Sequence, residues 1–282
     1  MRPLLVRTRV DLDAALAAHR SVQSRVALVP TMGALHAAHA ELIRRARDEA
    51  AVVVVTIFVN PAQFGPGEDL DRYPRQLAAD VAMCAREGVD LVFAPDVDAV
   101  YPEDPGGGIT VDPGAAGLVL EGAARPTHFR GVLTVVAKLF GIVRPDVAVF
   151  GEKDYQQLVL VSQLARDLCL RVRVVGVPIV RADDGLAVSS RNAYLDGDGR
   201  QAAVALSTAL TAGQQQQGAG ADAVHAAAAQ ELGRAEGVEV DYVAVTDPAL
   251  GPAPASGPAR LLVAAQVGST RLLDNAALSL GG

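Results

Sequence analysis

Residues 51–59 read Ala-Val-Val-Val-Val-Thr-Ile-Phe-Val, a run that is apolar and β-branched almost throughout. Apolar and polar residues do not alternate within it, so neither face of the predicted strand is suited to contact with water. Strands covered on both faces occur mainly in parallel sheets, where helices pack on either side. The run therefore predicts an α/β fold.

The residues on both sides of this run alternate between strand and helix patterns. Upstream, residues 26–29 form a short apolar strand that ends at Pro30, and residues 39–49 have the spacing of an amphipathic helix. Downstream, helix patterns at 77–87, 131–143 and 155–168 are interleaved with strand patterns at 91–93, 147–150 and 172–177. This order predicts a parallel sheet with right-handed crossovers and helices on both faces.

The pattern changes after residue 178, where two alanine-rich helices and then three strands are predicted, at 201–213, 221–232, 238–245, 260–267 and 271–273. The glutamine- and glycine-rich stretch 213–220 is typical of a mobile linker, and the proline-rich stretch 251–258 of a loop. We therefore predict two domains: residues 1–179 with the parallel sheet, and a smaller one, residues 180–282, with helices and an antiparallel sheet.

The composition disfavours several classes of function. The 282 residues carry a net charge of −7 without any block rich in lysine and arginine, which argues against binding to nucleic acid. The longest apolar runs fall short of the roughly 18 residues of a membrane span, and residues 1–20 lack the apolar core of a signal peptide. We expect a cytoplasmic protein that does not bind membranes. Cys84 and Cys169 lie in apolar helical patterns and are expected to be buried, unreactive thiols.

The first candidate motif is Pro-Thr-Met-Gly-Ala-Leu-His-Ala-Ala-His at 30–39, between the first predicted strand and its helix. In parallel sheets, ligands bind beyond the carboxyl ends of the strands. His36 and His39 share a helical face and would add side-chain donors to the positively polarised start of the helix, a natural phosphate site. Two other interpretations stay open: an exposed pair without function, and a metal site, for which further ligands are missing nearby.

The second motif follows the strand at 51–59. Asn60 and Gln63 place two amides at the lip of the sheet, where they would fix the hydroxyl groups and carboxylate of a small ligand, and Phe58 and Phe64 would form an apolar wall. Ordinary turn chemistry is the alternative, because Asn-Pro and Gly-Pro-Gly favour turns on their own.

Two further motifs carry cations. After the strand at 147–150, Gly151 permits close backbone approach, Lys153 offers a point charge for phosphate, and Asp154 would cap the next helix. Residues 189–191, Ser-Ser-Arg, would grip terminal phosphates. The alternatives are a solvated surface lysine and a polar interdomain loop. His128 opens another helix that would line the same cleft, and neither a P-loop nor a GxGxxG motif occurs.

The order and the residue sequences of these motifs closely resemble those of the pantoate–β-alanine ligase (pantothenate synthetase) family. The resemblance rests on PTMGALH at 30–36, IFVNPAQFGPGEDLDRYPR at 57–75, RPTHFRGVLTVVAKLF at 125–140, VFGEKDYQQL at 149–158, DGLAVSSRNAYL at 184–195 and RLLDN at 271–275. It implies a Rossmann-like domain of the nucleotidyltransferase superfamily, a smaller C-terminal lid and a homodimer. It also implies ATP-dependent condensation of D-pantoate with β-alanine through a pantoyl adenylate, with Mg²⁺ on the ATP and release of AMP and diphosphate.

The resemblance also implies roles for individual residues. Those with catalytic roles are His36, His39, Lys153 and Arg191. Those that bind ATP are Met32, His36, His39, Gly151, Lys153, Asp154, Val188, Ser189, Ser190 and Arg191. Those that bind pantoate are Thr31, Met32, Phe58, Asn60, Gln63, His128 and Gln157. No residue is assigned to the metal.

The chain departs from the family between the two histidines. The family usually reads His-Glu-Gly-His, whereas Ala37 and Ala38 stand here. Alanine favours a helix over glycine by about 1 kcal/mol, but a closely bound nucleotide would meet the added methyl group of Ala38. Two rival functions follow: a nucleotidyltransferase that keeps the nucleotide in its product, and a nucleotide-binding protein with impaired catalysis. Release of AMP distinguishes the ligase from both.

Overall fold

The computed structural model describes residues 2–21, 24–105 and 107–281. The chain forms two compact units. The first contains the residues up to Glu152 together with Gln156–Pro178, and the second contains Lys153–Tyr155 together with the residues from Ile179 onward. Within the described ranges, no helix is long and apolar enough to cross a membrane.

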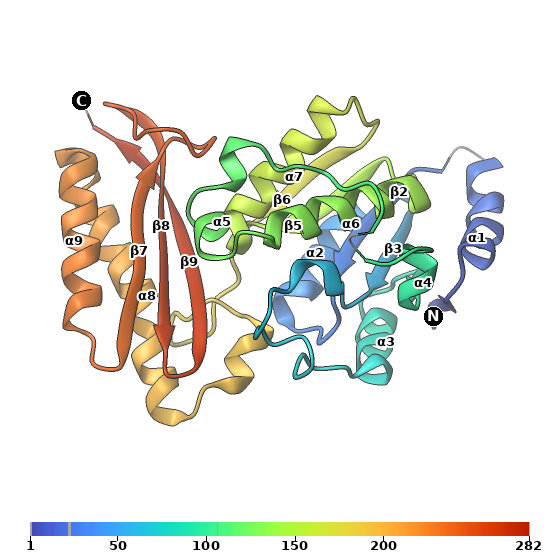
Figure 1. The fold of residues 1–282 in the computed structure, drawn as a ribbon, viewed down its shortest axis with the longest axis horizontal. Coiled ribbons are helices and arrows are strands. Elements are labelled where there is room, and N and C mark those ends of the chain that lie inside the picture. The colour runs from blue at the N-terminus through green and yellow to red at the C-terminus, as the bar shows by residue number, and fades with distance from the viewer. Residues whose placement is uncertain (1, 22–23, 106, 282) are drawn as a thin grey trace. The chain divides into compact units, whose positions relative to one another are not determined.

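The first unit is built on a six-stranded sheet in which every neighbouring pair is parallel. Its strands are β1 (Leu4–Val6), β2 (Val26–Thr31), β3 (Val52–Ile57), β4 (Leu91–Phe93), β5 (Val147–Gly151) and β6 (Arg173–Val177). They lie in the order β1-β4-β3-β2-β5-β6 (Figure 1). The predicted parallel sheet is thus confirmed. The sequence patterns missed only the edge strand β1, a three-residue strand in which Leu4 and Leu5 are exposed.

Helices cover both faces of this sheet. On one face lie α1 (Arg9–Ser21), α6 (His128–Val143) and α7 (Tyr155–Asp167), and on the other lie α2 (Ala37–Glu49) and α3 (Leu77–Arg86). Alternate residues of β2 enter the two cores, because Val26 and Leu28 pack with the first set of helices while Ala27 and Val29 pack with the second. The expected burial of the central strands on both faces is confirmed. The short helices α4 (Val97–Val100) and α5 (Glu121–Ala124) lie in the long connection to α6.

The second unit is an antiparallel sheet with two helices, as predicted. Its strands β7 (Val238–Thr246), β8 (Gly257–Val267) and β9 (Thr270–Leu280) lie in that order, and α8 (Gly197–Gln215) and α9 (Ala221–Arg234) pack on one face. The glutamine-rich stretch is a structured turn instead of a bare linker. Gln217 fastens it, because its side-chain oxygen accepts from Ser279 N at 3.0 Å and its carbonyl from Gly281 N at 3.0 Å.

The two cysteines differ in their surroundings. Cys84 on α3 is buried, and this burial raises the pKa of its thiol to about 12. Cys169 is exposed, so the prediction that it is buried was wrong. It lies beyond the end of α7, in a turn where its φ of +53° leaves the helical path that the sequence pattern extended.

Gly131 on α6 allows a helix to touch the turn that follows β3. A Cβ atom at this position would come within 2.1 Å of the Ala62 carbonyl oxygen. The Gly131 carbonyl also accepts a hydrogen bond from the Asn60 side chain at 3.2 Å. The contact therefore sets the distance between α6 and the turn after β3.

Replacement of Gly131 by alanine should destabilise the first unit by about 3 kcal/mol, because backbone atoms must move to admit the methyl group. Gly141, on the same helix, is exposed and has open space at its Cβ position, so Gly141→Ala is the matched control. The control should stabilise the protein by up to about 1 kcal/mol, because alanine favours the helix. Urea unfolding of both variants measures the difference. Equal midpoints would contradict the close packing at Gly131.

Candidate active site

The sheet has one place where its strand order changes direction, between β2 and β5. From β2 the chain adds β3 and β4 on one side, and β5 and β6 lie on the other. In open parallel sheets, ligands bind outside the carboxyl ends of the strands at such a switch point. Thr31 ends β2 and Gly151 ends β5, so two of the sequence motifs begin at this position.

The turn after β2 is held by buried polar groups. The Thr31 hydroxyl donates to the Thr56 carbonyl at 2.6 Å and accepts from Gly33 N at 3.2 Å. The carboxylate of Asp80 accepts from Ala34 N at 3.1 Å and from Leu35 N at 2.8 Å. Burial raises the pKa of Asp80, while its bonds from the backbone act in the opposite direction. Asp80 comes from α3 and was not a sequence candidate, since nothing in its local pattern marks it.

The two histidines lie at the start of α2. His36 is the residue before the first turn of the helix, and the ring centroids of His36 and His39 are 4.1 Å apart. The His36 backbone N–H donates to His39 Nδ1 at 3.2 Å. A backbone amide can only donate, so Nδ1 is the acceptor and neutral His39 carries its proton on Nε2. This bond therefore leaves His39 a side-chain donor at the positive end of the helix.

Asn60 connects the turn after β3 to its surroundings. Its side chain is almost fully buried, with 1% exposure. Its oxygen accepts from the Tyr101 hydroxyl at 2.8 Å and from Ala62 N at 3.3 Å, and its nitrogen donates to Gly131 O at 3.2 Å. Burial raises the pKa of Tyr101 to about 12, so the phenol remains a donor at neutral pH. These bonds position the turn. Direct contact of Asn60 with pantoate stays a prediction.

Gln63 and Met32 are brought together from the ends of two neighbouring strands. The Asn60 amide nitrogen donates to the Gln63 side-chain oxygen at 3.0 Å, which orients the Gln63 amide. The Gln63 nitrogen then lies 3.1 Å from the Met32 sulfur. Phe58, by contrast, is buried among the apolar side chains that pack against α6, with its ring 6.3 Å from that of Tyr101.

His128 is held between a carbonyl group and a guanidinium group. Its Nδ1 lies 3.0 Å from the Gln63 carbonyl oxygen, and its Nε2 lies 3.2 Å from Arg125 Nη1. Because a guanidinium group only donates, Nε2 must accept, and the proton lies on Nδ1. Burial, helped by the Arg125 charge, lowers the pKa of His128 to about 4. A neutral His128 therefore supports the Gln63 backbone.

Arg125 is itself paired with Glu68. Its Nε donates to Glu68 Oε1 at 2.9 Å, and its Nη2 bonds the other carboxylate oxygen. The pKa of Glu68 is lowered overall, because the bond and charge of Arg125 outweigh the effect of burial. Both residues stand in strings that carried the family resemblance, but their pairing was not predicted.

The two glutamines at the start of α7 differ in environment. Gln156 is buried and fastens the preceding connection, accepting from Glu121 N at 3.0 Å and donating to the carbonyl groups of Ala116 and Val119 at 2.8 Å. Gln157 is half-buried. Its role in binding pantoate stays a prediction.

The remaining candidates belong to the second unit. Lys153 Nζ lies 3.8 Å from the Asp154 carboxylate, and the lysine side chain is 19% exposed, so it is not a fully solvated surface lysine. Val188 N donates to Val180 O at 2.9 Å and closes a hairpin that leads into the short helix Ser190–Tyr194. The Ser189 hydroxyl accepts from Arg191 N at 3.3 Å at the start of that helix.

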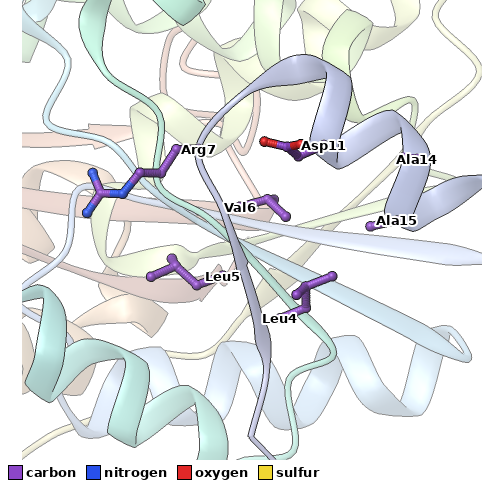
Figure 2. Close-up of a pocket in the computed structure, with 7 residues that line it drawn as sticks. All are labelled: Leu4, Leu5, Val6, Arg7, Asp11, Ala14 and Ala15. Atoms are coloured by element: carbon purple, nitrogen blue, oxygen red, sulfur yellow. The ribbon is translucent and has the colours of Figure 1, made fainter.

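The structure thus gathers part of the predicted site within the first unit. Met32, Asn60, Gln63 and His128 form one connected chain of contacts. A separate hollow of about 480 Å³ lies beside the edge strand β1, lined by Leu4, Leu5, Val6, Arg7, Asp11, Ala14 and Ala15 (Figure 2). It contains none of the candidate residues.

The fold is a Rossmann-like α/β fold, and several of the candidate residues follow strands at the switch point of its parallel sheet. The family model for pantoate-beta-alanine ligase matches residues 4–277. The chain therefore belongs to the pantoate–β-alanine ligase family, and its activity is the joining of pantoate to β-alanine.

Relatives and solved structures agree with this assignment. Pantothenate synthetase from Nocardioides sp. is 57% identical over 289 residues, covering 99% of this chain and 86% of the relative. The Saccharopolyspora erythraea enzyme is 60% identical over 263 residues, covering 93% of this chain and 86% of the relative. Pantothenate synthetase from Thermus thermophilus superposes with a TM-score of 0.90 at 44% identity, covering 97% of this chain and 98% of that one.

A second solved structure carries ligands. The pantoate-beta-alanine ligase of Francisella tularensis, complexed with beta-gamma ATP and beta-alanine, has a TM-score of 0.80. It is 31% identical to this chain, and the match covers 97% of both chains.

The lowered pKa of His128 predicts an acid-sensitive contribution to stability. Folded His128 has a pKa of about 4 against an ordinary value of 6.5, so the unfolded chain binds the proton more readily. The contribution is complete above pH 6.5 and is lost as the pH falls toward 4. Between pH 6.5 and 4.5 the loss is about 2 kcal/mol.

The variant His128→Asn keeps a donor for the Gln63 carbonyl but does not titrate. Its urea midpoint should fall less than that of the unmodified protein between pH 6.5 and 4.5. His225, which is exposed on α9, provides the control His225→Asn. An unchanged pH dependence in His128→Asn would rule out a neutral, buried His128.

Proposed function

We propose that the chain joins its substrates in two steps through a pantoyl adenylate. A carboxylate oxygen of pantoate attacks the α-phosphorus of ATP, the bond from that phosphorus to the bridging oxygen breaks, and diphosphate leaves. The neutral amine of β-alanine then attacks the acyl carbon, AMP leaves, and the nitrogen loses a proton as the amide forms. The Francisella tularensis relative, complexed with beta-gamma ATP and beta-alanine, supports ATP and β-alanine as substrates here.

One observation carries this proposal: a histidine-bearing helix start and an amide-bearing turn follow neighbouring strands. β2 leads into His36 and His39, and β3 leads into Asn60 and Gln63. The two strands are paired in parallel over their whole length, from Val26 with Val52 to Thr31 with Ile57. Their carboxyl ends therefore lie side by side, which suits a reaction between a nucleotide phosphate and a small carboxylate.

The histidines suit the role of phosphate donors. Negative charge develops on the α-phosphoryl oxygens during the first step, so donors fixed in advance lower the barrier. The His39 Nε2–H is fixed by the bond between Nδ1 and His36 N. The helix start contributes further N–H groups and its positive dipole. His36 and His39 would therefore stabilise charge without acting as nucleophiles.

Gln63 is the best-placed partner for pantoate. Its side-chain nitrogen faces the Met32 sulfur, and a thioether is a weak acceptor. Little is lost when that N–H turns to a hydroxyl or carboxylate oxygen of pantoate. Asn60 and His128 would act through Gln63 by holding its side-chain oxygen and its carbonyl. Thr31, Phe58 and Gln157 would complete the pantoate pocket.

The second unit would supply the cations for the leaving group. We assign Lys153 to the α/β region of ATP, and Ser189, Ser190 and Arg191 to the diphosphate, with Met32, Gly151, Asp154 and Val188 as further ATP contacts. This unit would act as a lid that keeps water from the adenylate. No group of three or more His, Cys, Asp or Glu side chains suited to a metal occurs among the described residues. Mg²⁺ would therefore arrive with the ATP phosphates.

The family resemblance supports two further proposals, that the enzyme is a homodimer and that it works in the cytoplasm. Light scattering of the purified chain tests the first, since a monomeric mass across micromolar concentrations would exclude the dimer. Fractionation of the source cells tests the second.

The adenylate route predicts that labelled diphosphate exchanges into ATP when pantoate is present and β-alanine is absent. Lys153→Ala should lower this exchange by about 100-fold or more, because a charge on the transferred phosphoryl group is lost, while thermal stability changes little. Complete reactions should release one AMP for each pantothenate. The absence of pantoate-dependent exchange would contradict the adenylate route. Unchanged exchange in Lys153→Ala would contradict the proposed role of Lys153.

Ala38 tests the departure between the histidines. If its methyl group limits the approach of the nucleotide, Ala38→Gly should lower the KM for ATP, at a cost of up to about 1 kcal/mol in helix stability. Ala37→Gly carries the same cost at an exposed position and is the matched control. Equal KM values for ATP in the two variants would show that Ala38 does not restrict the nucleotide.

A further inference from the structure

The string Arg-Leu-Leu-Asp-Asn at 271–275 has no part in the reaction described so far. It lies on β9, and its last two residues are polar yet buried, with 3% exposure for Asp274 and 2% for Asn275. Buried polar groups are retained at a cost unless they are bonded. Their partners therefore indicate what the two residues do.

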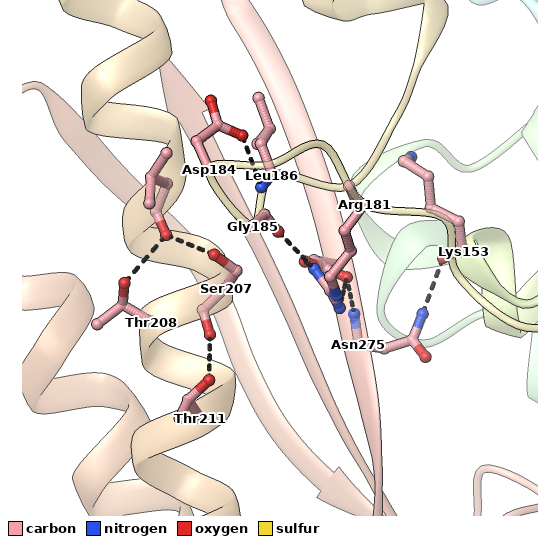
Figure 3. A network of polar contacts seen from close by, with 12 residues as sticks. Lys153, Arg181, Asp184, Gly185, Leu186, Ser207, Thr208, Thr211 and Asn275 are labelled. Carbon is pink, nitrogen blue, oxygen red and sulfur yellow. Dashed lines mark hydrogen bonds and ion pairs between the residues drawn. The ribbon is translucent and has the colours of Figure 1, made fainter. Parts of the chain in front are cut away.

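Asn275 holds the backbone of Lys153. Its side-chain nitrogen donates to the Lys153 carbonyl oxygen at 2.9 Å, and its side-chain oxygen accepts from Arg260 Nε at 2.8 Å. Figure 3 shows the Asn275 amide reaching from β9 to the Lys153 backbone. The bond to Arg260 fixes which way the amide faces, because Arg260 can only donate.

The residues around Lys153 are fastened to the same sheet. The Arg260 guanidinium carbon lies 3.9 Å from the centre of the Tyr155 ring, and the Tyr155 hydroxyl donates to Pro248 O at 2.9 Å. These contacts explain why Lys153–Tyr155 belong to the second unit while Glu152 and Gln156 belong to the first. The Lys153 backbone is therefore bound to β9.

Asp274 holds the other cationic segment. Its two carboxylate oxygens accept from Arg181 Nη1 at 2.6 Å and from Arg181 Nη2 at 3.0 Å. Arg181 also donates to Gly185 O at 3.1 Å (Figure 3). Its backbone pairs with that of Ala187. This pairing closes the hairpin that continues directly into residues 188–191.

We propose that Asp274 and Asn275 are positioning residues that align Lys153 and the segment 188–191 for the phosphates of ATP. Two adjacent residues of one strand hold both segments, so the cations keep a fixed spacing. A buried ion pair is often no more stabilising than apolar residues of the same size, so its value here is geometric. The inference rests on the proposed roles of Lys153 and Arg191. The experiment distinguishes a failure of this inference from a failure of those roles.

The primary variant is Asn275→Asp, which keeps the acceptor for Arg260 and removes the donor to the Lys153 carbonyl. In pantoate-dependent exchange, its kcat/KM for ATP should fall between about tenfold and 100-fold, with the KM for pantoate changed by less than about twofold. Asp241→Asn is the matched control, because it breaks an ion pair between β7 and Arg271 of β9 that touches neither segment. The control should retain full exchange.

A double variant shows whether Asn275 acts through Lys153. When Asn275→Asp is added to Lys153→Ala, the further loss of kcat/KM for ATP should be less than about twofold, because residues that act as a unit are not additive. Multiplying losses would overturn the inference and leave Asn275 a structural residue. If Lys153→Ala alone has no effect, the proposed phosphate role of Lys153 fails instead.

A second variant covers the case in which Asn275→Asp does not fold. Asp274→Asn keeps the shape of the side chain and removes the charge that pairs with Arg181. Its kcat/KM for ATP should fall at least about tenfold, while the KM for pantoate should stay unchanged. Normal kcat/KM for ATP in a folded Asp274→Asn variant would overturn the inference.

Discussion

The burial of β2 and β3 on both faces is the constraint on which the rest of the molecule depends. Where the alternate side chains of a strand enter two apolar cores, the strand has little room for a polar functional group before its carboxyl end. Polar side chains of the sheet that are proposed to contact a substrate are therefore expected at the end of a strand or in the turn that follows it. Parallel pairing brings those ends to one edge of the sheet, and the change of direction between β2 and β5 opens that edge.

The turns beyond the strands face a second physical problem, because irregular backbone near a core leaves N–H and C=O groups without partners. The same solution recurs three times. The Asp80 carboxylate caps the turn after β2, the Asn60 amide fastens the turn after β3, and the Asn275 amide fastens the turn after β5. All three side chains are buried. Asp80 and Asn275 come from other elements, whereas Asn60 lies in the turn itself and bonds to α6. The three turns that carry candidate site residues are thus each fastened by a buried polar side chain.

The sequence could predict what depends on local pattern. Continuous apolar strands, helical spacing and the order of the elements were sufficient to predict the parallel sheet. A strand that is buried on both faces needs an unbroken apolar run, and such a run is visible in the sequence. The position of His36 and His39 after a strand was visible for the same reason. Partners far apart in the chain were not visible. Nothing near Asp80 indicates that it binds Ala34 and Leu35, 46 and 45 residues away.

Polar residues near the site were the hardest to interpret from sequence, because a residue type does not reveal its partner. Asn60 and His128 have the chemistry of substrate ligands, and the structure also bonds both to protein groups. Their contact with pantoate stays a prediction. Cys169 was misjudged because the helical pattern continues past the turn that ends α7. For Cys169 the missing information was three-dimensional, namely the point at which the backbone leaves the helical path.

The proposed roles of residues in the two units have a consequence for an acyl adenylate, which water destroys. The residues proposed to bind pantoate belong to the first unit, whereas the cations proposed for the phosphates belong to the second. If those cations bind ATP, part of the binding energy of the phosphates serves to hold the second unit in place. Water exclusion is then strongest when the nucleotide is bound and relaxes when diphosphate and AMP leave. A site built wholly within the first unit would lack this link between the presence of the reactive species and its protection.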